Sequence, residues 1–343
     1  MPDDFAGSEK PQSIGMLLLP GFNGMAAHAF LDPFRAANYL RARNVYEWKF
    51  LSPEGGDITA SNGAVFAATH DLKSEEQGHD FLIVNASWTP EQFQEKTLQS
   101  WLRAASRRGS MLGGIDTGAF VLAYAGLLEN HSAVVHYEHQ AAFAELFPTV
   151  MSEESLYVID RRRLSCCGGA ASIDLALEII QMQHGIELAN AAARYIFHER
   201  LRQGNESQIP RHLEPVGYQV PEIVREAILL MERNVEEPLT QPELAQLLAL
   251  SVRQVQRLFK RYVGVTPLRF YLNIRLDRAR GLVTQTELPI MEIAALTGFP
   301  RAEQLSRAYQ GRFDITPIKD RIDGRIPFQF RNFTDHAGYH SVD

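Results

Sequence analysis

Apolar runs alternate with amphipathic segments along the first two hundred residues of the chain. Residues 14–19 form a short apolar run that suits a buried parallel strand, and residues 25–43 repeat apolar side chains at helical spacing. Further strand-like runs at 81–84 and 110–115 are each followed by a helix-like segment, the first of which spans residues 90–108. This alternation predicts a doubly wound α/β domain, flavodoxin-like, with a mostly parallel sheet.

The pattern changes twice more along the chain. The α/β domain is expected to span residues 13–202, with its last amphipathic helix over 187–202. Residues 203–220 are rich in Gly and Pro and show little periodicity, which indicates a linker. Residues 221–327 are predicted to form an all-α domain, and the tail 328–343 holds four aromatic side chains among polar residues.

The helical part contains a repeat with an offset of about fifty residues. Each copy is typical of a short helix, a tight turn and a second helix. A duplicated helix-turn-helix can place two helices in successive major grooves of double-stranded DNA. The matching segments are 242–245 with 291–294, 257–259 with 307–309, and 266–267 with 316–317.

Charge and composition limit the class of protein. The net charge is -7, but residues 251–280 hold eight basic side chains and the single acid Asp277. No run approaches the roughly 18–20 apolar residues that span a bilayer. The polar N-terminus lacks a signal-peptide pattern, and the adjacent Cys166 and Cys167 cannot build a disulfide framework. We therefore expect a cytoplasmic protein with no membrane partner, cofactor or metal site.

In the first repeat, the helix after the turn has a polar face that suits base recognition. Ser251 can cap this helix, and Val255, Leu258 and Phe259 form its apolar stripe. Arginine can donate two hydrogen bonds to guanine, and glutamine can pair with adenine through its amide. A solvated helix face is the alternative interpretation. The candidate DNA-contacting residues are Arg253, Gln254, Gln256, Arg257 and Lys260.

The corresponding helix of the second repeat is less basic. Glu303 can accept a hydrogen bond from the N4 amino group of cytosine, although an acid also repels phosphate. Between the repeats, residues 267–283 form one long predicted helix, which would space the two reading helices about 34 Å, one duplex turn, apart. The candidate residues here are Ala302, Glu303, Gln304, Ser306 and Arg307.

Several segments carry a family resemblance: Glu243–Ala245, Ser251–Lys260, Arg275–Arg280, Ile293–Phe299, Leu305–Arg307 and Thr316-Pro317. They resemble the DNA-binding domain of the AraC/XylS family of transcription regulators over about a hundred residues. The resemblance implies base contacts by Arg253, Gln256 and Arg257 of the first helix and by the five candidate residues of the second. Asp314 stands where the family usually has Gly in a left-handed turn. Ile318-Lys319-Asp320 replaces the usual Tyr and Arg.

The first domain carries a second set of segments, which are 18–22, Asn62-Gly63, 113–120, Cys167–Gly169 and Asp174-Leu175. They resemble the class I glutamine amidotransferase-like domain found in one branch of the same family. In enzymes of this fold, a cysteine nucleophile occupies a turn between a strand and a helix. Asp116 stands at that turn here, and a carboxylate cannot follow the thioester route. We therefore expect the chain not to be an enzyme.

Other side chains near this turn each have two interpretations. His136 resembles the histidine that follows the turn in the family, but a lone histidine is more often a structural hydrogen-bonding group than a base. Thr117 lies one residue out of register for a nucleophile. Cys166 and Cys167 are expected to be buried and inert, with a redox sensor as the alternative.

The turn is also a candidate ligand site, because ligands bind outside the carboxyl ends of strands in α/β sheets. Asp116 would favour a cationic or amine-bearing molecule, and Trp88 could add an aromatic face for a quaternary ammonium. Alternatively, Trp88 is core packing and Asp116 caps the following helix. The resemblance implies effectors such as arginine, carnitine or glycine betaine. The candidate effector-binding residues are Trp88, Asp116, Thr117 and His136.

These features favour a ligand-responsive regulator that binds operator DNA as a homodimer, contacts RNA polymerase and activates a catabolic operon. Its small-molecule effector would act by binding two arrangements of the chain with different affinities. Two alternatives stay open. One is an amidase or hydrolase fused to a DNA-binding domain, and the other is an architectural DNA-binding protein without an effector.

Overall fold

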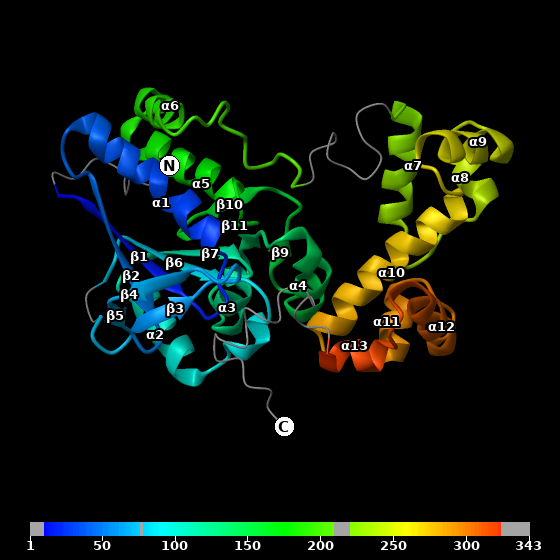
Figure 1. Cartoon of the computed structure of the whole chain (residues 1–343), viewed down its shortest axis with the longest axis horizontal. Helices are drawn as coiled ribbons and strands as arrows, with labels where there is room; N and C mark the ends of the chain where they lie inside the picture. The colour runs from blue at the N-terminus through cyan, green and yellow to red at the C-terminus, as the bar shows by residue number, and fades with distance from the viewer. Residues whose placement is uncertain (1–9, 76–77, 209–219, 324–343) are drawn as a thin grey trace. The chain divides into compact units, whose positions relative to one another are not determined.

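The computed structural model describes residues 10–75, 78–208 and 220–323. The described residues form two compact units, 10–208 and 220–323 (Figure 1). Residues 209–219 of the predicted linker, and the whole of the predicted tail, lie outside the described residues. Within the described ranges, no helix is both long and apolar enough to cross a membrane.

The first unit contains a seven-stranded sheet in the order β10-β11-β7-β6-β1-β2-β5. Neighbouring strands are parallel, except that β10 is antiparallel to β11. The doubly wound α/β prediction is confirmed. The strands of this sheet are β1 (Gln12–Leu18), β2 (Tyr46–Ser52), β5 (His70–Asp71), β6 (Phe81–Ala86), β7 (Met111–Asp116), β10 (Tyr157–Asp160) and β11 (Arg163–Cys166).

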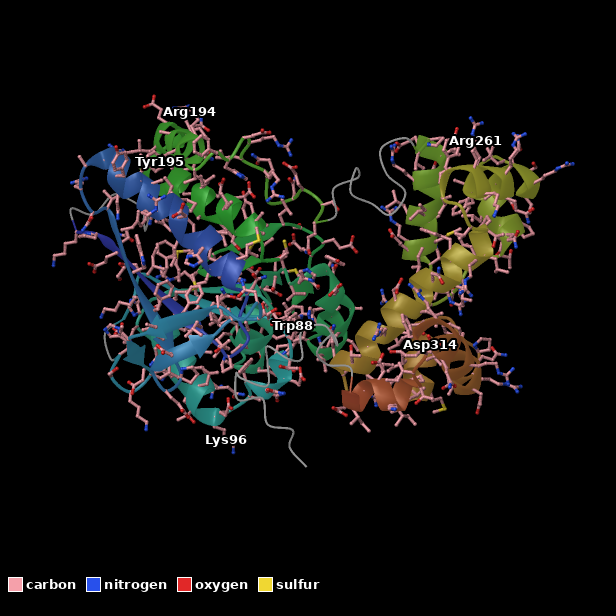
Figure 2. The ribbon with its side chains drawn as sticks, in the orientation of Figure 1. Trp88, Lys96, Arg194, Tyr195, Arg261 and Asp314 are labelled. Carbon is pink, nitrogen blue, oxygen red and sulfur yellow. The ribbon has the colours of Figure 1, made fainter. Side chains whose placement is uncertain are left out.

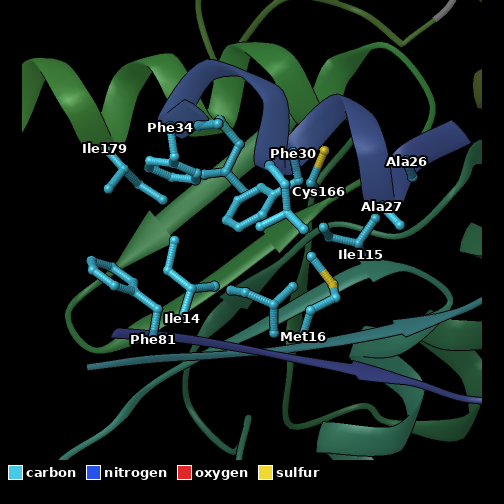
Figure 3. Close-up of a cluster of buried hydrophobic side chains, with 14 of the residues drawn as sticks. Ile14, Met16, Ala26, Ala27, Phe30, Phe34, Phe81, Ile115, Cys166 and Ile179 are labelled. Atoms are coloured by element: carbon cyan, nitrogen blue, oxygen red, sulfur yellow. The ribbon is translucent and has the colours of Figure 1, made fainter. Parts of the chain in front are cut away.

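Helices cover both faces of this sheet. They are α1 (Gly24–Arg41), α5 (Ala171–His184) and α6 (Ile186–Tyr195) on one face, and α2 (Lys96–Arg107), α3 (Gly118–Tyr124) and α4 (Gln140–Leu146) on the other. Successive residues of β1 point to opposite faces, so Met16 belongs to the first cluster and Leu17 to the second. Figure 3 shows the first cluster, in which Ile14 and Met16 of the sheet lie below Phe30 and Phe34 of α1.

Two predicted helices of this unit differ from the structure. Residues 90–108 do not form one helix, because a short 3₁₀ helix, η2 (Pro90–Gln92), precedes α2. The helix expected over 187–202 ends with α6, and Phe197 then adopts a left-handed φ of 58°. The remaining short elements are β3 (Gly56–Thr59), β4 (Val65–Ala68), β8 (Ser132–Ala133), β9 (Met151–Ser152) and η3 (Tyr137–His139).

The chain beyond α6 is held on the first unit by a buried carboxylate. Asp174 of α5 accepts hydrogen bonds from Nε2 of His198 at 2.9 Å and from Nη2 of Arg202 at 2.6 Å. Burial acts to raise the pKa of Asp174, but the hydrogen bonds from His198 and Arg202 outweigh it, so the pKa is lowered. Gln208 then donates to the carbonyl of Val135 at 2.9 Å, so the start of the predicted linker packs on this unit.

The described part of the second unit consists of helices and the loops that join them, and it contains both predicted helix-turn-helix motifs, α8–α9 and α11–α12. Capping boxes begin the first two of these helices: Thr240 with Glu243 on α8, and Ser251 with Gln254 on α9. The helices are α7 (Glu222–Arg233), α8 (Gln241–Leu247), α9 (Val252–Tyr262), α10 (Pro267–Gln285), α11 (Ile290–Leu296), α12 (Ala302–Phe313) and α13 (Pro317–Asp323).

The sequence repeat is also a structural repeat. Across residues 251–267 and 301–317, the two helix-turn-helix motifs have buried, intermediate and exposed positions in the same order, with one exception. At that exception Gln256 is exposed and Ser306 is intermediate. The second helix of each unit therefore packs on the domain through the same face.

Candidate nucleic-acid interface and ligand site

The second helix of the first helix-turn-helix, α9, has one exposed basic face. Val255 and Phe259 are buried in the core of the domain. No acidic residue lies in α9, so an approaching phosphate backbone meets an attractive charge along the whole helix. All the predicted contact residues are exposed: Arg253, Gln254, Gln256, Arg257 and Lys260. The prediction omitted Arg261, which is also exposed and is marked in Figure 2, although its place next to Lys260 indicates it.

Hydrogen bonds divide these side chains into two groups. Gln254 accepts from the backbone nitrogen and the hydroxyl of the N-cap serine, both at 2.8 Å, so its carbonyl is committed to capping α9. Gln256 donates from Nε2 to Oε1 of Gln241 on α8 at 2.8 Å. Within the described residues, Arg253 and Arg257 form no hydrogen bond or ion pair through their side chains, so both guanidinium groups are available to DNA.

The corresponding helix of the second helix-turn-helix, α12, carries both acidic and basic side chains. Leu305 and Tyr309 are fully buried and fix the orientation of the helix. Glu303 occupies the position that Arg253 has in α9, so the charge is reversed there. This makes α12 the weaker electrostatic anchor for a phosphate backbone. Glu303, Gln304 and Arg307 are exposed, and Ala302 and Ser306 are partly exposed.

The long helix α10 connects the two helix-turn-helix motifs. Arg275 donates to the carbonyls of Thr297 and Gly298 at 2.8 and 2.6 Å, and its guanidinium lies 4.1 Å from the centroid of the Phe299 ring. Helices α8 and α9 lie near the start of α10, and α11 to α13 lie near its end (Figure 1). With 19 residues α10 is about 28 Å long, which is comparable with a duplex turn of roughly 34 Å.

Both departures from the family pattern are accommodated by the structure. Asp314 is the C-cap of α12 and has the left-handed conformation expected there, with a φ of 56°. Asp320 is 1% exposed, and its carboxylate accepts from the Tyr309 hydroxyl at 2.6 Å and from Nε of Arg280 at 2.9 Å. Asp320 therefore ties α10, α12 and α13 together, a role that the sequence did not indicate.

In the first unit, the turn after β7 has the backbone geometry of a sharp elbow. Asp116, the last residue of β7, has a left-handed φ of 60°. Gly118 lies against β6, where an added Cβ atom would collide with the carbonyl oxygen of Val84. Thr117 is the N-cap residue of α3, and its hydroxyl donates to the carbonyl of Ser87. The alternative in which Asp116 caps the following helix is therefore wrong.

The Asp116 side chain lies where several strands end. Asn23, which follows β1, donates from Nδ2 to Oδ2 of Asp116 at 2.8 Å. Asn85 at the end of β6 holds Asn23 in place, because it accepts from its backbone nitrogen and donates to its carbonyl. Beyond β11, Gly168 comes so close that an added Cβ atom would lie 2.9 Å from Cβ of Asp116. Asn23, the N-cap of α1, and Asn85, near the end of β6, were both missed in the sequence.

Asp116 is a buried carboxylate without a strong cationic partner. It is 4% exposed, and burial raises its pKa. The charge of His136 and hydrogen bonds from Asn23 and Ser87 act in the opposite direction but are outweighed. Within the described residues, neither Lys nor Arg forms an ion pair with this carboxylate. A cationic ligand would supply the missing countercharge.

Two other candidate residues lie at the same end of the sheet. Trp88 is partly exposed and follows β6 by two residues, and Ala86 of β6 pairs with Asp116 of β7 (Figure 2 marks Trp88). His136 is partly exposed, with its ring centroid 4.4 Å from that of Tyr137. Of the charged groups around Asp116, His136 acts most strongly on the pKa of this carboxyl.

The two cysteines are buried, as expected of inert thiols. Cys166 is fully buried among the apolar side chains of the cluster in Figure 3, and Cys167 is 7% exposed. A hydrogen bond with Cys166 and burial raise the pKa of the Cys167 thiol. Both effects keep this sulfur protonated and unreactive.

Comparison with known proteins places the chain among regulators. A family model described as a helix-turn-helix domain matches residues 244–321. The HTH-type transcriptional regulator CdhR of Pseudomonas aeruginosa is 38% identical over 310 residues, which are 90% of this chain and 91% of that protein. The HTH-type transcriptional regulator GlxA of Rhizobium meliloti is 34% identical over 312 residues, 90% of this chain and 95% of that protein. The chain belongs to the AraC/XylS family of transcription regulators.

Membership of the AraC/XylS family makes this chain a DNA-binding transcriptional regulator rather than an enzyme. A second relative, the HTH-type transcriptional regulator GbdR of Pseudomonas aeruginosa, is 36% identical over 315 residues, 92% of this chain and 85% of that protein. A crystal structure of a THiJ/PfpI family protein from Pseudomonas syringae has a TM-score of 0.52 and 17% identity, and covers 68% of this chain and 93% of that one. This likeness supports the α/β fold of the first unit.

Proposed function

We propose that this AraC-family regulator activates a catabolic operon in response to a small nitrogenous metabolite. The observation that carries the effector part is the Asp116 carboxylate, which is buried at a left-handed elbow without a Lys or Arg partner among the described residues. A cation that enters such a site stabilises the ionised form of Asp116, so the carboxyl group releases its proton and becomes a strong partner. The effector class that this supports best is a quaternary amine or an amino acid with a cationic group.

The neighbouring residues would have distinct roles in binding. Trp88 would offer an aromatic face to the cation, as aromatic rings do for quaternary ammonium groups. His136 would contribute a hydrogen bond at the border of the site. Thr117 would hold the elbow, because its hydroxyl already donates to a backbone carbonyl. Asn23 would fix the orientation of the Asp116 carboxylate through its 2.8 Å hydrogen bond.

Matched pairs of ligands test this effector class. Calorimetric titration of the full chain would compare glycine betaine, carnitine and choline with partners in which an uncharged tert-butyl group replaces the trimethylammonium group, and arginine with citrulline, in which an uncharged ureido group replaces the guanidinium group. At least one cation is expected to bind while its uncharged partner does not. The Asp116→Asn variant should lose this discrimination and keep its fold. Equal binding of a charged and an uncharged partner to the wild type would contradict the proposal.

Coupling between effector and DNA follows from thermodynamic linkage. If the effector changes operator affinity by some factor, then operator DNA must change effector affinity by the same factor. Both affinities can be measured on the full chain with one labelled operator. An architectural DNA-binding protein without an effector would show no change in either.

On the DNA side, we propose that α9 and α12 read two neighbouring major-groove segments. The free guanidinium groups of Arg253 and Arg257 support α9 as the main reading helix. The acid Glu303 supports a narrower role for α12, in which cytosine is favoured at one position.

We also propose that the regulator is a homodimer joined through the first unit and contacts RNA polymerase from the operator. Large apolar side chains are exposed on α1 and next to α6, including Tyr39 at 66% and Phe197 at 93%. The Tyr39 ring contacts that of Tyr195, marked in Figure 2, with centroids 5.0 Å apart. Exposed apolar groups of this kind favour an interface. Sedimentation analysis should show a dimer that Tyr39→Ser with Phe197→Ser dissociates, and a wild-type monomer would contradict it.

A further inference from the structure

One hydrogen bond joins α9, the reading helix of the first helix-turn-helix, to the helix before it. Gln256 of α9 donates from Nε2 to Oε1 of Gln241, the first residue of α8, at 2.8 Å. Neither residue belongs to the capping boxes of α8 and α9, which use other side chains. The bond is therefore not required to begin either helix, and it leaves the exposed Gln256 on the DNA-reading face.

The chemistry of the amide explains what this bond can do. A glutamine amide has two N–H groups and one carbonyl oxygen. When a neighbour accepts one N–H, the amide plane is fixed, and the other N–H and the carbonyl remain as a donor and acceptor pair. Adenine requires this pair, because its N7 accepts and its N6 amino group donates. A side chain that is held in advance loses less conformational freedom when it binds.

The second helix-turn-helix lacks this arrangement. Ile290, the first residue of α11, stands where α8 has Gln241, and an isoleucine side chain accepts no hydrogen bond. Ser306 stands in the place of Gln256. This is also the position at which the exposure of the two reading helices differs. Of the two helix-turn-helix motifs, only the first has the glutamine pair.

We propose that Gln241 is a positioning residue for base recognition, which orients the Gln256 amide so that α9 favours adenine at one operator position. Gln241 acts through Gln256 and does not itself contact the base. The inference rests on the proposed role of α9 as a reading helix.

Selection of binding sites from random-sequence DNA by the full chain tests this role. The Gln256→Ala variant identifies the position, where an adenine preference of roughly 5- to 100-fold should disappear. Gln241→Met keeps the side-chain length but removes the acceptor, and it should lower the same preference about threefold or more while other positions stay unchanged. Gln241→Glu keeps an acceptor oxygen and should retain the preference, although its charge lowers affinity for all sequences.

Two further variants separate positioning from a general effect. Gln246→Met changes an exposed glutamine elsewhere on α8 and should alter no base preference. In the Gln256→Ala background, Gln241→Met should have no added effect on preference, because a positioning residue acts only through the side chain it holds. The Gln241→Glu variant keeps the test valid if Met disturbs folding, since an acid suits the first turn of a helix.

The outcomes are distinct. Full adenine preference in Gln241→Met, or an effect that persists without the Gln256 amide, overturns the positioning role while the reading function of α9 stands. A wild-type chain that selects no site overturns the proposed function of α9, and this inference fails with it.

Discussion

Tyr309 donates its hydroxyl to the buried carboxylate of Asp320 at 2.6 Å, and this bond joins the second reading helix to α13. Burial and the neighbouring Asp320 raise the pKa of Tyr309, so its hydroxyl remains a donor at ordinary pH. Arg280 of α10 binds the same carboxylate oxygen. The second helix-turn-helix is therefore fixed to the long helix by a polar core as well as by apolar packing.

Removing the Asp320 carboxylate should destabilise the second helix-turn-helix. Asp320→Ala leaves the buried Tyr309 hydroxyl without its acceptor, and an unsatisfied buried group costs about 1–3 kcal/mol. Chemical denaturation of the full chain, followed by a probe in the second unit, measures the loss. Glu292→Ala removes an exposed acid from α11 and should change stability by less than about 0.5 kcal/mol. Equal stability of the two variants would contradict the role of Asp320.

Arg257 should carry base-specific affinity. Arg257→Ala is expected to cost about 1–3 kcal/mol of binding to a selected site and to relax the preference at one base pair, because a guanidinium can pair with both acceptors of guanine. Titration of labelled DNA at fixed salt measures both effects. Arg233→Ala, an exposed arginine at the end of α7, serves as the matched control. Unchanged sequence preference in Arg257→Ala would exclude base contact.

Glu303 should trade affinity for selectivity. Glu303→Gln removes a negative charge from the reading face of α12, so binding to all sequences should become tighter at a fixed salt concentration. At the same time, a preference for cytosine worth about 1–3 kcal/mol should weaken at one position. Competition between matched and single-substituted sites measures the two effects separately. Tighter binding with intact cytosine preference would mean that the acid only repels phosphate.

Much of the architecture was predictable because it follows from periodicity. The apolar runs of the sheet and the duplicated helix-turn-helix are local patterns, and the repeat even fixed which residues of α9 and α12 are exposed. The left-handed turn at Asp314 was also indicated, because the family pattern places a glycine there.

Contacts between segments distant in sequence were not predictable in this way. Asn23 reaches Asp116 across 93 positions, and Asp320 meets Arg280 across 40. No local pattern encodes such a pair, since each partner alone is an ordinary polar residue. The end of α6 was missed for a similar reason: the residues after it bind Asp174 instead of continuing the helix.

Asp116 should make the stability of the first unit depend on pH. Burial raises its pKa above the ordinary value of 3.8, so the folded chain retains a proton that the unfolded chain releases. Its contribution to stability is then full below the ordinary pKa and is lost as the pH rises through the raised value. Asp116→Asn is neutral at every pH, so it should unfold at a higher temperature than the wild type at neutral pH.

Thermal unfolding at a series of pH values checks this sign. The advantage of Asp116→Asn should shrink toward acid pH, where the wild-type carboxyl is also neutral. Asp57→Asn, at an exposed position of β3, should follow the wild type throughout. A wild type that is more stable than Asp116→Asn at neutral pH would show that the ionised carboxylate is well satisfied without a ligand.

Hydroxyl-radical footprinting of the full chain on a selected site tests the central claim most directly, namely that one chain places two helices in neighbouring major grooves. The account predicts paired protected segments on one face of the duplex, with centres about 10 base pairs apart. Arg257→Ala should weaken one segment of each pair, and Arg307→Ala the other. A single protected segment for each bound chain, or the same loss from both variants, would contradict it.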